Sequence, residues 1–207
     1  MNNTLPHFLA HIIPDDALHA KWLNTLSFME NCGAKKISRC QHPYLVTEII
    51  LKHAAEEARH GYYLKKQLAK LSTEALTTYE AKYLLAPSKS IRYLDQLDIQ
   101  ICKLLKKEYE LSGERLKYGA YLLVTYAIEV RADDMYPIYQ QFLTDFNSRV
   151  NVKSIIIEET EHLKEMESGI GIFFEHPVKI MEKVRTLEEN LYNEWMVALN
   201  NALPIYN

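Results

Sequence analysis

Residues 53–60 read HAAEEARH, and further along the chain residues 158–162 read EETEH. Each stretch places a glutamate three residues before a histidine, and positions i, i+3, i+4 and i+7 share one face of an α-helix. On that spacing the two faces are Ile50, His53, Glu57, His60 and Leu64 in the first stretch, and Ile155, Glu159, His162 and Met166 in the second. Burying a carboxylate and an imidazole on such apolar faces is costly unless something compensates the charge, and a metal ion is one such compensator.

Two further stretches carry a single glutamate in the middle of a similar face. The first face is Trp22, Leu26, Glu30, Gly33 and Ile37, and the second is Leu122, Tyr126, Glu129 and Asp133. The chain therefore reads Glu, Glu-x-x-His, Glu, Glu-x-x-His, with 27 residues from Glu30 to Glu57 and 30 from Glu129 to Glu159. A helix bundle with one Glu on each of two helices and Glu-x-x-His on the other two builds a carboxylate-bridged dinuclear site.

The same periodicity predicts an all-α protein with a single domain over residues 1–207. We expect core helices at about 16–37, 43–71, 114–146 and 152–168, and additional helices at about 73–110 and 177–202. Pro14, Asp15 and Asp16 look like a helix start. Pro137 should kink or interrupt its helix, and Gly169 and Gly171 should end theirs. No alternating run around Asn-Gly or Asp-Gly predicts a β-hairpin.

Composition narrows the function classes. The apolar fraction of 48% and charged fraction of 25% are ordinary for a globular protein, and a net charge of −3 gives no reason to expect nucleic acid or an anionic membrane as a partner. Three cysteines without a CxxC pair fit reduced thiols better than disulfides and exclude a rubredoxin-like iron site. Because neither a signal peptide nor an apolar span is evident, we expect a cytoplasmic protein without membrane contact.

The segments MENCGAKKI, EEARH, YAIEVRADD and EETEH resemble the ferritin-like di-iron carboxylate superfamily, over residues 16–168 but not over the last forty or so. The resemblance implies a ferritin-like four-helix bundle with additional helices and two bound Fe ions, with Mn at one or both positions as an alternative. It also implies the ligands Glu30, Glu57, His60, Glu129, Glu159 and His162.

Neighbouring residues extend the resemblance less specifically. Glu56 and Glu158 occupy a position where di-iron oxygenases often have an Asp that accepts a hydrogen bond from a ligand His, and solvent exposure is the alternative. His53 completes an HxxxExxH pattern similar to that of arylamine N-oxygenases, so it is either a seventh ligand or a buried His beside the site. Tyr126 and Asp133 are candidates for supporting the site, with ordinary packing and solvation as the alternatives.

Three functions remain open on the sequence. The first is a non-haem di-iron oxidase or oxygenase that uses O2 and an electron donor to oxidise a small organic substrate, since hard carboxylate oxygens with imidazoles suit iron or manganese. The second is a ferritin- or rubrerythrin-like iron-binding or peroxide-scavenging protein, and the third is a bundle without metal. We expect a homodimer, with the C-terminal helix either packed on the bundle or at the interface.

Overall fold

Seven α-helices and two short 3-10 turns make up the secondary structure of residues 4–41, 44, 46–71 and 76–204, which this computed structural model describes, and no strand occurs among them. The elements are α1 (Leu5–Ile12), α2 (Asp16–Cys40), α3 (Glu48–Gln67), η1 (Leu68–Lys70), η2 (Ala81–Tyr83), α4 (Pro87–Glu108), α5 (Gly113–Asp145), α6 (Lys153–Phe173) and α7 (Pro177–Asn201). The prediction of an all-α protein is confirmed. Among the described residues, none of the helices combines the length and apolar character needed to cross a bilayer.

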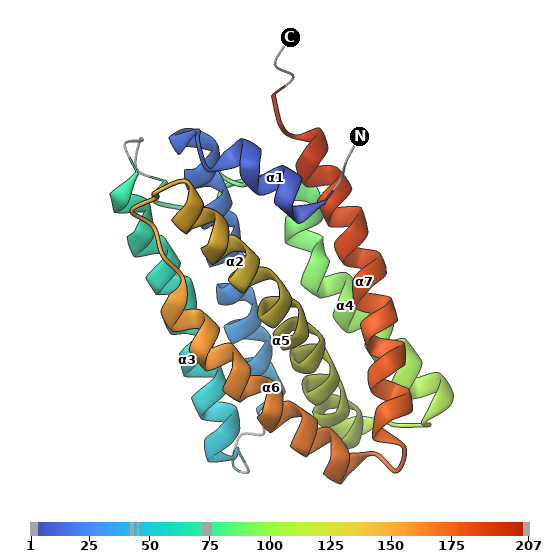
Figure 1. Ribbon diagram of the computed structural model, residues 1–207. Coiled ribbons are helices and arrows are strands. Elements are labelled where there is room, and N and C mark those ends of the chain that lie inside the picture. The colour runs from blue at the N-terminus through green and yellow to red at the C-terminus, as the bar shows by residue number, and fades with distance from the viewer. Residues whose placement is uncertain (1–3, 42–43, 45, 72–75, 205–207) are drawn as a thin grey trace.

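The long helices pack in three pairs, α2 with α3, α5 with α6, and α4 with α7. Figure 1 shows α2, α3, α5 and α6 grouped together, with α4 and α7 alongside and α1 across one end. The C-terminal helix α7 thus packs within this chain, against α4 and α5. The four helices that carry the Glu and Glu-x-x-His positions are therefore neighbours.

Two apolar clusters fill the interior and leave the candidate ligands between them. One cluster contains Trp22, Leu26, Leu64, Met135 and Ile155, and the other contains Ile37, Ile50, Leu122, Ala127 and Met166. Along each of α2, α3, α5 and α6, residues of one apolar cluster precede the polar positions and residues of the other cluster follow them. Apolar burial on both sides of a polar layer fixes the rotation of each helix, because turning the helix would expose both apolar groups.

The expected starts of α2 and α7 agree with the structure. The Asp15 side chain accepts hydrogen bonds from the backbone N–H groups of Ala17, at 2.9 Å, and Leu18, at 3.1 Å, and so caps α2. Pro177 begins α7. The core helix expected at about 43–71 begins later than predicted, at Glu48, since the described residues 44, 46 and 47 are not helical. The segments at 42–43 and 72–75, where the sequence suggested two more starts, lie outside the described residues.

Three residues that were expected to interrupt or end helices lie inside continuous ones. Pro137 does not interrupt α5, because it lies on the exposed face, where water can bond the carbonyl that its missing N–H leaves free. Gly169 and Gly171 do not end α6, which continues to Phe173. A Cβ at Gly169 would lie 2.8 Å from Leu122 Cδ2, so this glycine permits the close approach of α6 to α5.

Two elements differ from the expected additional helices. Within the expected range 73–110, the described helix begins only at Pro87 and ends at Glu108. Helix α1 was not predicted at all, although Phe8, Leu9 and Ile12 form a buried stripe after a proline in its first turn. At eight residues it is too short for periodicity to identify, and its burial against α2, α5 and α7 stabilises it.

Candidate metal centre

Six side chains from four helices converge between the apolar clusters. Glu30 comes from α2, Glu57 and His60 from α3, Glu129 from α5, and Glu159 and His162 from α6. They form two groups with ligand atoms within 4.8 Å of one another: Glu30, Glu57, His60 and Glu159, and Glu57, Glu129, Glu159 and His162. Glu57 and Glu159 belong to both groups, so each could bridge two ions. The structure thus brings together all six residues that the sequence proposed, with one His in each group.

The site concentrates negative charge away from water. All of the six except the half-buried Glu30 are buried, and Glu129 is 1% exposed. Burial, together with the charges of Glu30 and Glu159, raises the pKa of Glu57 well above its usual range. Burial and the charge of Glu159 do the same to the pKa of Glu129. Without a cation, these two carboxyl groups therefore hold their protons to higher pH than carboxyl groups in water do.

In each of the two histidines, the two ring nitrogens have different surroundings. His60 Nε2 lies 2.7 Å from Glu158 Oε2, and His162 Nε2 lies 2.7 Å from Glu56 Oε2. Because a carboxylate only accepts hydrogen bonds, each Nε2 carries the proton in the neutral imidazole. Each Nδ1 then presents a lone pair to the carboxylate group, which is the arrangement of a metal-binding histidine.

Several buried polar atoms at the centre have no hydrogen-bond partner among the described residues. These atoms are His60 Nδ1, His162 Nδ1 and both carboxylate oxygens of Glu129. His60 Nδ1 lies 2.9 Å from Glu159 Oε1, but without hydrogen-bond alignment. Buried polar atoms are rarely left unpaired in this way. Four carboxylates and two neutral imidazoles carry four negative charges, which two divalent cations would balance, so these residues fit a dinuclear metal site.

Glu56 and Glu158 bond across the helix pair, each to the histidine of the opposite helix. The sequence left open whether Glu56 and Glu158 bond to candidate ligands or are exposed to solvent. The structure shows the hydrogen bonds. Arg59 also donates to Glu158 Oε1, at 3.0 Å. These contacts tie α3 to α6 and fix both imidazole rings.

His53 lies beside the centre but outside both donor groups. Its Nδ1 is 2.8 Å from the Tyr121 hydroxyl and its Nε2 is 2.7 Å from Glu165 Oε2. Since both ring nitrogens have protein partners, the structure favours a buried histidine beside the site over a seventh ligand.

Tyr126 and Asp133 do not touch the six residues in the way the sequence suggested. Tyr126 is buried in the apolar cluster near Arg185 of α7, and the half-buried Asp133 accepts a hydrogen bond from Thr160 at 3.2 Å. Tyr136, which sequence reasoning missed, instead donates a hydrogen bond to Glu30. Its position seven residues after Glu129, on the same face of α5, was the available signal.

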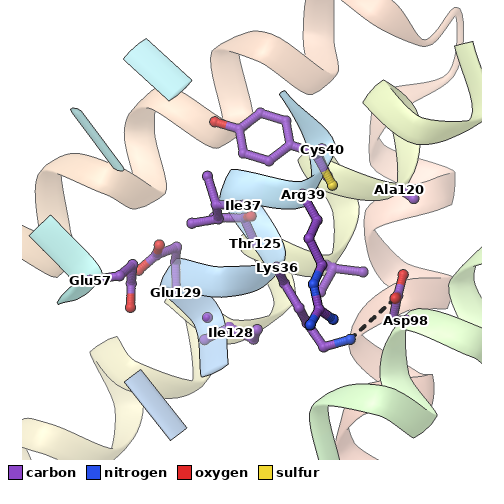
Figure 2. Close-up of a pocket in the computed structure, with 13 residues that line it drawn as sticks. Lys36, Ile37, Arg39, Cys40, Glu57, Asp98, Ala120, Thr125, Ile128 and Glu129 are labelled. Atoms are coloured by element: carbon purple, nitrogen blue, oxygen red, sulfur yellow. Dashed lines mark hydrogen bonds and ion pairs between the residues drawn. The ribbon is translucent and has the colours of Figure 1, made fainter. Parts of the chain in front are cut away.

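Two cavities meet the centre from different sides. One of about 120 Å³ runs from Glu57 and Glu129 past Ile37, Val124 and Ile128 to Lys36, Arg39 and Asp98. In Figure 2, Glu57 and Glu129 lie at one end, and Lys36, Arg39 and Asp98 lie at the other. A second cavity of about 50 Å³ is lined by Glu30, Glu57, Met135 and Tyr136, among others.

Gly33 borders both cavities. A Cβ there would lie 3.3 Å from Glu57 Oε2, which is tighter than ordinary van der Waals contact. The missing side chain therefore leaves space directly beside a carboxylate that both donor groups share.

Comparison of the chain with protein-family models, with curated proteins and with solved structures gave no match. The buried Glu and His cluster, which could hold metal, therefore stands on the geometry described above.

Proposed function

We propose that the chain is a non-haem di-iron oxidase or oxygenase of the ferritin-like type. The observation that carries the proposal is the pair of overlapping donor groups, in which Glu57 and Glu159 are shared and each group adds one histidine. Two ferrous ions bound there would supply electrons to O2 for the oxidation of a substrate. Manganese at one or both positions is compatible with the same donors.

The chain's own residues would perform four tasks in this function. Glu57 and Glu159 would hold both ions, while Glu30 with His60 and Glu129 with His162 would complete the two positions. Glu158 and Glu56 keep a proton on each Nε2, so that each Nδ1 remains a donor.

The third and fourth tasks are the exclusion of water and the admission of substrate. The apolar clusters on either side of the centre limit access along the bundle. The cavity of about 120 Å³ instead reaches Glu57 and Glu129 from the side, between α2, α4 and α5. A cavity with apolar walls beside the ligands favours oxidation of an organic molecule over iron storage, which needs no such space.

The test is O2 uptake by protein loaded anaerobically with ferrous iron and then mixed with oxygenated buffer. We expect uptake much faster than for free ferrous iron, and loss of that rate in the double variant Glu57→Gln, Glu159→Gln. Glu161→Gln is the matched control, because Glu161 lies on α6 between Glu159 and His162 but is exposed. Uptake no faster than that of free iron would contradict the proposal.

Two further readouts separate the alternative of iron storage or peroxide scavenging. Retention of many more than two iron ions per chain in a large assembly would support storage. Oxidation of the ferrous site by hydrogen peroxide but not by O2 would support a peroxidase. A homodimer with O2 uptake agrees with the proposed oxidoreductase.

A further inference from the structure

We propose that the cavity of about 120 Å³ binds a small organic carboxylate, with its charged group at Arg39 and its apolar part directed towards Glu57 and Glu129. This inference names the substrate class of the proposed oxidoreductase and so rests on that function. The contrast between the two ends of the cavity and its walls carries the argument.

The outer end of the cavity carries Arg39, whose side chain is exposed. Lys36 Nζ lies 2.9 Å from Asp95 and 3.2 Å from Asp98, so its charge is already paired. No hydrogen bond or ion pair joins the Arg39 guanidinium to any other residue that the structure describes. Arginine presents donors in a planar fork that matches a carboxylate. Arg39 therefore suits an anionic group entering at this end, while Lys36 offsets the charge of Asp98 beside it.

The walls between the two ends are apolar. Ile37 of α2 and Ala120, Val124 and Ile128 of α5 line this part, and all but the half-buried Ile128 are buried. A purely ionic ligand would gain nothing there, whereas a hydrocarbon segment would remove apolar surface from water. At roughly 10–15 Å³ for each water-sized volume, the cavity of about 120 Å³ accommodates a molecule of about 8–12 non-hydrogen atoms.

The inner end of the cavity determines which part of the ligand would react. Glu57 and Glu129 line it, and both belong to the proposed metal centre. A carboxylate held at Arg39 would point its opposite, apolar end at the centre. The ligand's reactive carbon would then be remote from its charged group.

Binding of octanoate is the direct test, because octanoate combines one carboxylate with an apolar chain of suitable length. Its dissociation constant is measured by calorimetry and compared with those of octan-1-ol, which lacks the charge, and acetate, which lacks the chain. We expect octanoate to bind at least about tenfold more tightly than either, a difference of about 1.4 kcal/mol. Equal affinity for octanol would overturn the role of the charge, and equal affinity for acetate would overturn the role of the apolar walls.

Variants locate the binding. Arg39→Gln should weaken octanoate binding about tenfold, in line with the loss of one charge-assisted contact. The matched control is Arg92→Gln, because Arg92 is also exposed but does not line this cavity. Ala120→Phe should fill the cavity and weaken octanoate binding as well, with circular dichroism confirming that the helices persist. Unchanged affinity in Arg39→Gln would contradict the proposal irrespective of the result for Ala120→Phe.

The measurements are made on metal-free and on Mn-loaded protein, so that the two proposals can fail separately. If octanoate shows the expected pattern but the chain binds no metal, the carboxylate site stands and the di-iron function fails. If the chain binds two metal ions but octanoate binds no better than octanol, the metal centre stands and the assignment of substrate class fails.

Discussion

Metal binding should release at least one proton per chain at pH 7, because the empty centre holds protons that the ions must displace. Burial raises the pKa of Glu57 and of Glu129 well above the usual range, so both carboxyls hold their protons to higher pH than exposed carboxyls do. Burial alone would lower the pKa of His60, but the nearby Glu159 and Glu30 outweigh it and raise that pKa to about 9. Ions that take lone pairs from these three groups must displace the protons that the groups carry, among them the one that His60 holds at pH 7.

The release has a second consequence, for affinity. For each proton that leaves when two ions bind, the product of the two binding constants should rise about tenfold for each unit of pH near neutrality. Two ordinary charged helix faces would show neither effect, since exposed carboxylates are already ionised at pH 7.

Calorimetric titration with Mn²⁺ in two buffers of different ionisation enthalpy measures the number of protons released. Glu57→Gln should lower that number, because it removes a carboxyl whose pKa burial raises, whereas the exposed control Glu161→Gln should leave it unchanged. Release of fewer than one proton per chain by the wild-type protein, with two ions bound, would refute the reasoning about the buried charges.

Three further changes test separate parts of the site. Glu158→Gln should weaken metal binding by about 10–100-fold, because it removes the carboxylate that holds the His60 proton on Nε2, and unchanged affinity would show that this contact is incidental. Gly33→Ala should stabilise α2, since alanine favours helix by about 0.5–1 kcal/mol, yet weaken metal binding by crowding Glu57, and thermal unfolding with metal titration would reveal the opposite signs. Metal-free protein should lose up to about 3 kcal/mol of stability from His60 as pH rises. The contribution of His60 is complete below pH 6.5, the ordinary histidine pKa, and is lost as pH passes 9. A rise in the free energy of urea unfolding over this range would contradict the pKa assignment.

The identity of the candidate ligands was readable from the sequence because helical spacing is a local property. Glu57 and His60, for example, share a face whichever helix lies opposite, and the apolar residues on either side indicated that the face is buried. The order of the six residues along the chain then indicated which helices had to meet. Their role as metal ligands remains a prediction.

Features that depend on how helices pack against one another could not be obtained in the same way. The pairing of Glu56 with His162, and of Glu158 with His60, requires the rotation and offset of α3 relative to α6. Tyr136 reaches Glu30 only because α5 lies beside α2 at that height. Sequence spacing also misjudged Gly169, since a glycine that ends a helix and one that admits a neighbouring helix look alike along the chain.

Metal content per chain is the measurement that tests the central claim most directly. Protein purified without chelator, and the same protein after anaerobic incubation with ferrous iron, should contain about two Fe or Mn ions per chain by elemental analysis. The double variant Glu57→Gln, Glu159→Gln should lose both ions, because each side chain belongs to both donor groups. Absence of bound metal from the reconstituted wild-type protein, or its full retention in the double variant, would contradict the account.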